Sequence, residues 1–328
     1  MLKLVLWGRI ACCIAAAAAV AIAAPSHAQS WPQRPVRVFI GFAAAGPPDI
    51  GTRVIAPKLG EYLGQPVIVE NRPGAGGMIA MELVAKAPPD GYTLALGTVG
   101  TMFLAKALIP TAAYDPLTSF VPVGIFAKTQ FIVVAHPSLG VNTLKDFVDL
   151  AKKQPGKLVY GSSTPGSPPH VLAEMFKDQA GVDILGIPYK GSADAATRFL
   201  ANDVQMMVDS YAILGPMITS GKARALMVTA KQRMKQLPDV PTAVEAGMPN
   251  YAVESWFSFV APAGTPDVAV RRLNAELART MKEKTVIEAI DKLGLETYVS
   301  TPEELGQIIR TDWPKWRDAV KAAGVKPQ

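Results

Sequence analysis

A regular alternation of short apolar runs with amphipathic segments constrains the fold of this chain more than any other feature. Apolar runs occupy residues 37–40, 67–69 and 92–96, and each is followed by a small-residue loop and then by helical periodicity. The strand-like segments KLVYGS, VDILGIPY, VQMMVDS and ARALMVTA repeat the pattern later. Apolar strands that alternate with helices are typical of an α/β fold with mostly parallel sheets. No internal repeat is evident in the sequence.

Two longer strand-like stretches, VPVGIFAKTQFIVVAHP and ESWFSFVAP, each join one α/β set to the next. A chain that leaves one lobe, builds another and returns needs two such crossings. We therefore expect residues 29–126 and 254–328 to form one lobe and residues 127–253 the other, with a ligand cleft between them. The crossings near residues 123–133 and 254–262 are the expected hinges.

Local signals predict where several helices begin. Asp49 is expected to cap the helix that follows the first loop, because Asp favours that position. Thr265 is expected to cap a later helix, and Thr301 with Glu304 has the pattern of a capping box. Pro314 is expected to kink or restart the last helix, because proline cannot donate a backbone hydrogen bond.

The first 28 residues have the pattern of a secretory signal peptide. Lys3 and Arg9 precede or flank an apolar run over residues 10–24, and Ser26-His27-Ala28 is a small-residue cleavage site. The apolar run is shorter than the roughly 20 residues that a membrane-spanning helix needs. We therefore expect cleavage after Ala28 and a periplasmic mature protein.

Cleavage would change the composition, because both cysteines of the chain, Cys12 and Cys13, lie in the predicted signal. The mature chain would then have no disulfide and no cysteine nucleophile. Its formal charge would fall from +6 to +4, a mild excess that suits a small anionic ligand but not nucleic acid. Zinc, calcium, nucleophile-elbow and complete dinucleotide motifs are missing from the sequence, so we expect no metal, no cofactor and no catalytic residue.

Three strands end in a loop of small or polar residues that leads into a helix start: GFAAAGPPD at 41–49, GTVGT at 97–101 and GSSTPGSPPH at 161–170. Such loops direct backbone N–H groups and hydroxyls at the positive end of a helix, which binds carboxylate or phosphate. In open α/β sheets ligands lie at this carboxyl end of the strands. These loops are therefore the predicted ligand site.

Specific segments run through the chain in a fixed order, among them WPQRPVRVFIGFAAAGPPDIGTR, LGQPVIVENRPGAGG, PPDGYTLALGTVGT, PGKLVYGSSTPGSPPHVLAEMFK, GIPYKGSADA, LPDVPTAVEAGMP and WFSFVAPAGTP. With these segments the chain resembles the periplasmic substrate-binding receptors of tripartite tricarboxylate transporters, often called Bug receptors. The resemblance covers essentially everything after the predicted signal.

The resemblance implies a type II periplasmic-binding-protein fold, in which two hinged lobes close on a small carboxylic acid and deliver it to a membrane permease. It implies a receptor rather than an enzyme, and we expect a monomer. Two alternatives remain open: a subunit that presents its ligand to a membrane signalling protein, and a two-lobe enzyme that acts on a carboxylate.

The matching loops supply the expected ligand-binding residues: Phe42, Ala43, Ala44, Ala45, Gly46, Thr98, Thr101, Ser162, Ser163, Thr164, Ser167, His170, Lys190 and Asp209. One of the two threonines is expected to face the ligand and the other to cap a helix. His170 could equally serve as a structural cap, and Lys190 as a solvated surface charge. Asp209 is expected to bind a ligand amine, hydroxyl or water, or to lock a loop, because two close carboxylates repel.

The first loop departs from the glycine-rich text that the family usually carries, because it reads Ala44-Ala45-Gly46-Pro47-Pro48 before the aspartate. Each proline removes a backbone N–H, so this loop offers fewer donors to a carboxylate. We therefore expect a ligand with one strongly held carboxylate and an apolar or aromatic body.

Overall fold

The computed structural model describes residues 31–322, so the predicted signal peptide lies outside the described residues. The residues from Arg34 onwards form one unit, which contains the fold and the candidate site. Among the residues that the structure describes, no helix is both long and apolar enough to span a membrane.

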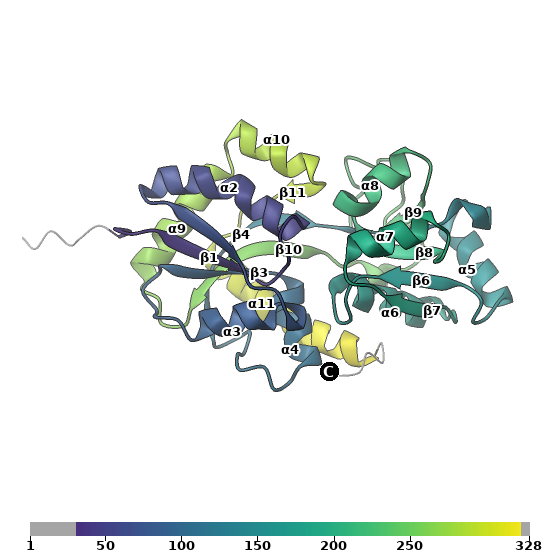
Figure 1. Ribbon diagram of the computed structural model, residues 1–328, viewed down its shortest axis with the longest axis horizontal. Helices are drawn as coiled ribbons and strands as arrows, with labels where there is room; N and C mark the ends of the chain where they lie inside the picture. Colours follow the sequence, from purple (N-terminus) through teal and green to yellow (C-terminus); the bar gives the residue numbers. More distant parts are fainter. Residues whose placement is uncertain (1–30, 323–328) are drawn as a thin grey trace, which may run out of the picture. The chain divides into compact units, whose positions relative to one another are not determined.

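The first sheet has six strands in the order β11-β4-β10-β3-β1-β2. Their bounds are β1 (Val36–Ile40), β2 (Val67–Asn71), β3 (Thr93–Gly97), β4 (Phe120–Thr129), β10 (Ser255–Pro262) and β11 (Leu295–Thr297). Helices cover both of its faces (Figure 1). They are α2 (Pro47–Leu63), α9 (Asp267–Thr280) and α10 (Lys284–Lys292) on one face, and α3 (Met78–Ala85), α4 (Ala105–Leu108) and α11 (Pro302–Ala322) on the other.

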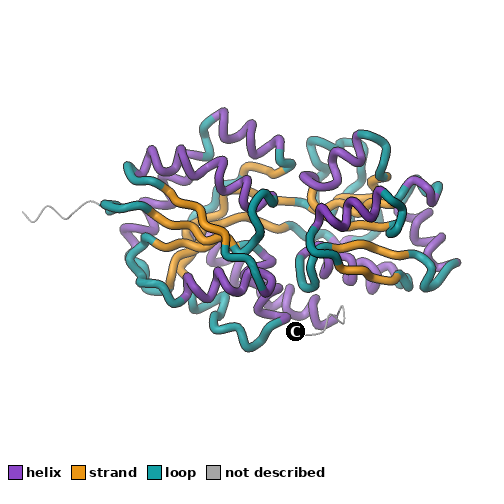
Figure 2. Tube along the Cα trace, viewed as in Figure 1, coloured by secondary structure: helices purple, strands orange, loops and turns teal. Residues whose placement is uncertain are grey.

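The second sheet has five strands in the order β7-β6-β8-β5-β9. Their bounds are β5 (Phe131–Ala135), β6 (Val159–Ser162), β7 (Leu185–Pro188), β8 (Met206–Ser210) and β9 (Arg224–Val228). Here too helices lie on both faces, and loops join them to the strand ends (Figure 2). One face carries α7 (Ser192–Leu200) and α8 (Tyr211–Thr219), and the other α5 (Leu144–Lys153) and α6 (Pro168–Ala180).

Both sheets are mixed, so the expectation of mostly parallel sheets was wrong. Parallel pairing is confined to β2-β1-β3 in the first sheet and to β7-β6-β8 in the second. The other strands pair antiparallel, including β4 and β10, which lie in the two predicted crossings. A strand by which the chain leaves one sheet and a strand by which it returns must run in opposite directions, which explains the antiparallel pair.

The junction between the sheets is short. β4 ends at Thr129 in the first sheet and β5 begins at Phe131 in the second, so a single residue, Gln130, separates them. All five residues of β5 are buried, as are all five of β8, including the polar Asp209 and Ser210 at its end. Burial on both faces accounts for the continuous apolar text of these strands.

Several helix signals differ from expectation. Gly46 rather than Asp49 is the N-cap of α2, because Pro47 and Pro48 supply the first two helical positions. The N-cap of α9 is Pro266, and the Thr265 hydroxyl donates to the carbonyl of Pro262 instead. The reciprocal bonds of the capping box at Thr301 are confirmed.

The last helix, α11, is one helix from Pro302 to Ala322 with Pro314 inside it, so the restart expected at Pro314 was wrong. Leu305, Ile309, Trp316 and Val320 are buried along one face of this helix. Their packing stabilises the helix on both sides of the proline, and tertiary contacts of this kind override local propensity.

Candidate functional site

Three loops at the carboxyl ends of β1, β2 and β3 meet at one edge of the first sheet. Glycines allow this close approach: a Cβ added to Gly41 would lie 2.6 Å from Cα of Gly77, and one added to Gly77 would lie 2.5 Å from Cγ2 of Thr101. No real side chain tolerates such distances. The small residues of these loops are therefore required to bring the three strand ends together.

The first of these loops is held by Asp49, which lies at the third position of α2 and is 3% exposed. Its Oδ2 accepts the backbone N–H of Ala45 at 2.9 Å, while Oδ1 accepts Nδ2 of Asn71 and Nε of Arg53, each at 2.9 Å. Burial tends to raise the pKa of Asp49, but these hydrogen bonds together with the Arg53 charge hold the pKa below its ordinary value. Asp49 is therefore an anion that locks the loop onto β2.

A loop of the same construction follows β6 in the second sheet. Gly166 donates its N–H to Nδ1 of His170 at 3.0 Å, and Ser167 is the N-cap of α6. The Ser163 hydroxyl donates to the Ser167 hydroxyl at 2.6 Å, which fixes the start of the loop to the cap. Burial lowers the pKa of His170, so this side chain is neutral near pH 7.

Residues 45–49 and 166–170 thus form a structural repeat that the sequence analysis missed. In both, a residue with positive φ (64° at Ala45, 77° at Gly166) precedes an extended N-cap, two prolines follow, and the third helical side chain accepts the N–H of the first residue. The signal was present in the text as AGPPD and GSPPH. We name these two segments the paired loops.

The paired loops offer few free backbone donors. The two prolines at each helix start have no N–H. The residue before each N-cap already donates its N–H, Ala45 to Asp49 and Gly166 to His170. A ligand carboxylate at either helix end would therefore depend on the remaining backbone groups, on hydroxyls and on water.

Thr98 and Thr101, in the loop after β3, bond to each other. The Thr101 N–H donates to Oγ1 of Thr98 at 3.1 Å, and the Thr98 N–H donates to Oγ1 of Thr101 at 3.0 Å. Both residues are buried, and the Thr101 hydroxyl also reaches the carbonyl of Leu96 at 3.3 Å. The reciprocal capping engages both threonines, and a ligand contact by one of them stays a prediction.

The carboxyl edges of the two sheets contact each other through glycines. A Cβ on Gly100 would lie 3.2 Å from Cγ of Pro168, the first residue of α6. A Cβ on Gly166 would lie 2.6 Å from Cδ1 of Leu108, the last residue of α4. The segment after β3 and the second of the paired loops therefore pack closely against each other.

Asp209 is the penultimate residue of β8 and is 3% exposed. Its Oδ1 accepts the N–H of Ser210 at 2.7 Å, whereas Oδ2 is buried and has no hydrogen-bond partner. The Ser192 hydroxyl at the start of α7 lies near the carboxyl group. Burial raises the pKa of Asp209 to about 6, against the opposing effect of Ser192 and Ser210.

The other predicted residues lie around these loops. Phe42 is half-buried and its carbonyl accepts Nδ2 of Asn71 at 3.1 Å, while Ala43, Ala44 and Ala45 are exposed. Ser162 is buried and Thr164 is exposed, and Lys190 lies exposed between β7 and α7. Sequence reasoning did not single out Arg53 or Asn71, which hold Asp49, because nothing in the text indicates that they converge on it.

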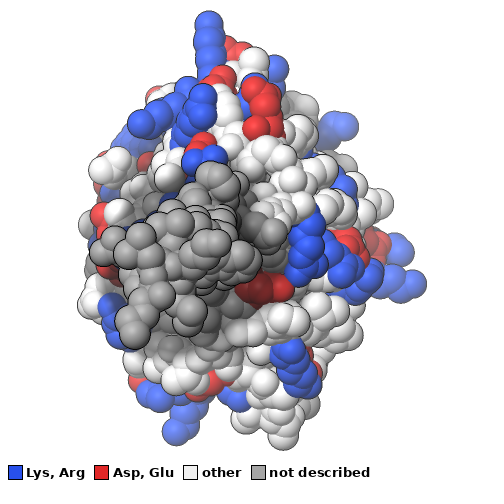
Figure 3. Space-filling model, turned by 90° about the vertical axis from the view of Figure 1, so that its left-hand side faces the viewer, with Lys and Arg blue, Asp and Glu red and all other residues white. Residues whose placement is uncertain are grey.

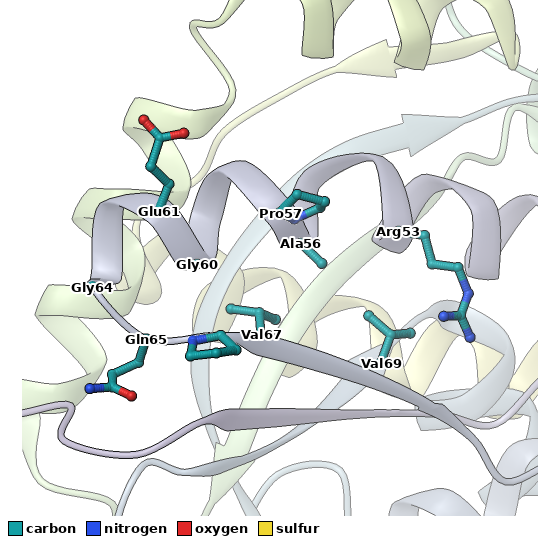
Figure 4. Close-up of a pocket in the computed structure, with 10 residues that line it drawn as sticks. Arg53, Ala56, Pro57, Gly60, Glu61, Gly64, Gln65, Val67 and Val69 are labelled. Carbon is teal, nitrogen blue, oxygen red and sulfur yellow. The ribbon is translucent and has the colours of Figure 1, made fainter.

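An open depression of about 660 Å³ lies elsewhere, between α2 and the edge strand β2 (Figure 4). Ala56, Pro57, Val67 and Val69 give it an apolar floor, and the Glu61 side chain points away from it. None of the predicted ligand residues lines it. The depression is therefore separate from the candidate site.

Two further observations bear on the kind of ligand. Within residues 31–322, no three His, Cys, Asp or Glu side chains are grouped so that they could hold a metal ion. On the face shown in Figure 3, Lys and Arg are interspersed with Asp and Glu among the described residues, which is unlike the continuous basic surface of a nucleic-acid-binding protein.

Two mixed α/β sheets joined through crossing strands, with loops that meet at their carboxyl edges, define the class of periplasmic binding proteins. The family model described as "Tripartite tricarboxylate transporter family receptor" matches residues 52–325. The chain is 33% identical over 310 residues to Protein BugT of Bordetella pertussis. The alignment covers 94% of this chain and 95% of BugT.

Solved structures agree. An R. palustris protein with adipate is 34% identical with a TM-score of 0.82, covering 91% of this chain and 100% of the other. MatC from Rhodopseudomonas palustris with bound malate is 32% identical with a TM-score of 0.79, covering 88% and 100%. The chain belongs to the receptor family of the tripartite tricarboxylate transporters. It is thus an extracytoplasmic substrate-binding receptor and not an enzyme.

Proposed function

We propose that this receptor captures a small carboxylic acid at the carboxyl edges of its two sheets and delivers it to the permease of a tripartite tricarboxylate transporter. The observation that carries the proposal is the contact between these edges, where Gly100 lies against Pro168 and Gly166 against Leu108. Relatives with adipate and with malate support a carboxylate as ligand. Cleavage after Ala28 would release the mature, monomeric receptor into the periplasm.

We infer that the two sheets belong to two lobes, residues 29–126 with 254–328 and residues 127–253, that close on the ligand. Each set of loops supplies part of the polar contacts, so the ligand gains most when both sets engage. Hydrogen bonds to a charged group are worth about 1.5–3 kcal/mol each, so three or four could give micromolar affinity after ordering costs.

The ligand that fits the paired loops has one strongly held carboxylate and an apolar or aromatic body. Pro47 and Pro48 remove two donors from the first loop, and Asp49 occupies the N–H of Ala45. The carboxylate of Asp49 would also repel a second ligand carboxylate nearby. Ala43 and Ala44, both exposed, add apolar surface at the same place.

A thermal-shift screen of the mature protein against aliphatic and aromatic monocarboxylates, dicarboxylates and citrate tests the function. A ligand at about 100 times its Kd should raise the stability by roughly 2.7 kcal/mol. Calorimetry and small-angle scattering with a confirmed ligand would then measure affinity and closure. Lack of binding by every acid would contradict the proposed function, and an unchanged radius of gyration would contradict lobe closure alone.

A further inference from the structure

The turn between α10 and β11 of the first sheet lies directly against the start of α8, which follows the second sheet's β8. A Cβ added to Gly294, in this turn, would lie 2.5 Å from both Cβ and Cδ1 of Tyr211, the first residue of α8. The same tyrosine ring covers Gly215, where an added Cβ would lie 2.7 Å from Cζ. Tyr211 is therefore held between a glycine of its own helix and a glycine that adjoins the other sheet.

This contact lies at the junction between the two sheets. Leu295, the residue after Gly294, pairs with the last residue of β4. Ser210, the residue before Tyr211, pairs with the first residue of β5, and only Gln130 separates β4 from β5. Continuing each register by one residue places Gly294 and Tyr211 next to Gln130, one from each sheet. A contact in this place limits how the sheets rotate, because hinge rotation is confined to a few residues.

A second bond joins the same turn to the second sheet. Nε2 of Gln236, in the segment that follows β9, donates to the carbonyl of Asp291 at 3.3 Å. This carbonyl also accepts the N–H of Gly294 at 2.9 Å. The turn is thus attached to the second sheet through two elements, α8 and the segment after β9.

The contact also connects the two parts of the candidate site. On one side, a Cβ added to Gly51 of α2 would lie 3.5 Å from Cδ1 of Leu295, and Gly51 is two residues from Asp49, which locks the first ligand loop. On the other side, Tyr211 is two residues from Asp209, the penultimate residue of β8. A displacement at the turn would therefore move the first loop relative to the end of β8.

Two separate requirements select glycine at position 294. The φ of Gly294 is 69°, in the left-handed region, which costs other residues stability in any arrangement of the lobes. The nearness of Tyr211 is the second requirement, and it applies only while the lobes are arranged as in this structure. One of the two nearest atoms is Cβ of the tyrosine, which cannot move without the backbone of α8. An added methyl group would therefore push the two sheets out of this arrangement.

We propose that Tyr211 and Gly294 are a pair of positioning residues, which set the arrangement of the two lobes in which the ligand is held. The proposal rests on the proposed function and deepens it, because it assigns the closed arrangement to a particular contact beside the crossing. The tyrosine acts through the packing of its side chain, and its hydroxyl is not required.

The test uses calorimetry to measure the Kd of whichever acid binds the wild-type protein most tightly among hexanoate, benzoate, malate and adipate. Gly294→Ala should weaken this binding about tenfold, which corresponds to about 1.4 kcal/mol. The matched control is Gly221→Ala, because Gly221 follows α8 with a φ of 72° and a Cβ there meets nothing within 4 Å. Both variants have the same backbone cost and should unfold at a lower urea concentration than wild type, but the control should keep the wild-type Kd.

A double-mutant cycle tests whether the effect acts through the tyrosine. Tyr211→Gly removes all three of the atoms nearest to the added methyl group, so Gly294→Ala in that background should change the Kd by less than about twofold. Tyr211→Gly alone should weaken binding about threefold, because the lobes lose the contact that orients them, and this variant carries the test if Gly294→Ala does not fold. Tyr211→Phe keeps these atoms and should bind as the wild type does.

A wild-type Kd in Gly294→Ala or in Tyr211→Gly would overturn the positioning role and leave the receptor function intact, even where the urea midpoint falls. An equal effect of Gly294→Ala with and without the Tyr211 side chain would overturn it as well. A loss of affinity in Tyr211→Phe would assign the hydroxyl to the ligand and contradict a role through packing. If none of the four acids binds the wild-type protein, the proposed function and the positioning role both fall.

Discussion

Gly166 donates its backbone N–H to Nδ1 of His170 across 3.0 Å, and this bond determines which nitrogen of the imidazole carries the proton. Because Nδ1 accepts, the neutral ring must carry its hydrogen on Nε2. Protonation of Nδ1 would turn the acceptor into a donor and break the bond. In the other member of the paired loops, the same place is taken by Asp49, which accepts from Ala45 at any pH above its lowered pKa.

Replacing His170 with Ala should leave the N–H of Gly166 without its acceptor. We expect the free energy of unfolding to fall by about 1 kcal/mol at pH 7.5, as measured by urea denaturation. His170→Asn provides an amide oxygen for the same bond and should lose less than half as much. Equal losses in the two variants would show that the bond is not what matters.

His170 should also make the stability of the protein depend on pH. Burial lowers the pKa of His170 below its ordinary 6.5, so the unfolded chain takes up the proton first as the pH falls. The stability that the neutral ring contributes is complete above pH 6.5 and is lost as the pH falls through the folded-state pKa. Stability curves of wild type and His170→Asn should therefore converge towards acid pH, and parallel curves would contradict this.

Gly100→Ala tests the contact between the two carboxyl edges. The added Cβ would lie 3.2 Å from Pro168, whose ring cannot move away as a flexible side-chain end would. We expect weaker binding of any confirmed ligand, by about tenfold, with a loss of stability of about 1–3 kcal/mol if the loops cannot shift. Gly306→Ala, in α11, is the control. Its Cβ would lie 3.4 Å from the end of Arg310 and 3.6 Å from Cγ of Pro122, which are ordinary contacts, and the helix should gain about 0.5–1 kcal/mol.

Replacing Pro47-Pro48 with Gly-Thr should restore two backbone donors and add a hydroxyl at the start of α2. We expect the preference of the receptor to shift from monocarboxylates towards dicarboxylates, measured as the ratio of their Kd values. A wild-type protein that already binds malate, succinate or citrate more tightly than aromatic or long-chain monoacids would show that the prolines do not set the preference.

Asp209 should destabilise the free protein at neutral pH. Burial raises its pKa from 3.8 to about 6, so the folded state holds the proton longer than the unfolded chain, and the stability falls as the pH rises from about 4 to about 6. The penalty above pH 6 is of the order of 3 kcal/mol, at 1.36 kcal/mol per pKa unit. Asp209→Asn should therefore be more stable than wild type at pH 7.5 and equal to it near pH 4, and a less stable variant at pH 7.5 would refute this.

Asp209→Ala and Ser163→Ala should weaken ligand binding.

Much of the fold follows from the sequence, because strands buried on both faces must consist of apolar residues. The strands β5 and β8 are of this kind, and the capping box at Thr301 was predicted from its local pattern. Strand direction cannot be predicted in this way, because an apolar run has the same residue pattern in a parallel and in an antiparallel pair. Pro314 shows the other limit: a local breaker is outweighed by buried residues on both sides of it.

The loops of the candidate site could be predicted from the sequence, but the hydrogen bonds within them could not. The paired loops escaped detection because Ala45 and Gly166, and likewise Asp49 and His170, differ in residue type while performing the same backbone role. The pairing of β5 with β8, which sets Ile132 opposite Asp209, joins residues 77 positions apart. No local pattern encodes such a pairing.

A single residue, Gln130, joins β4 to β5, so the number of residues in this junction is constrained by both sheets. Side chains alternate between the two faces of a strand, so one inserted residue between Thr129 and Phe131 would turn every side chain of β5 to the opposite face. Buried valines would then exchange places across the second sheet. Natural variation among receptors of this construction should therefore add or remove residues in the loops around the ligand, while the crossing keeps a constant number of residues.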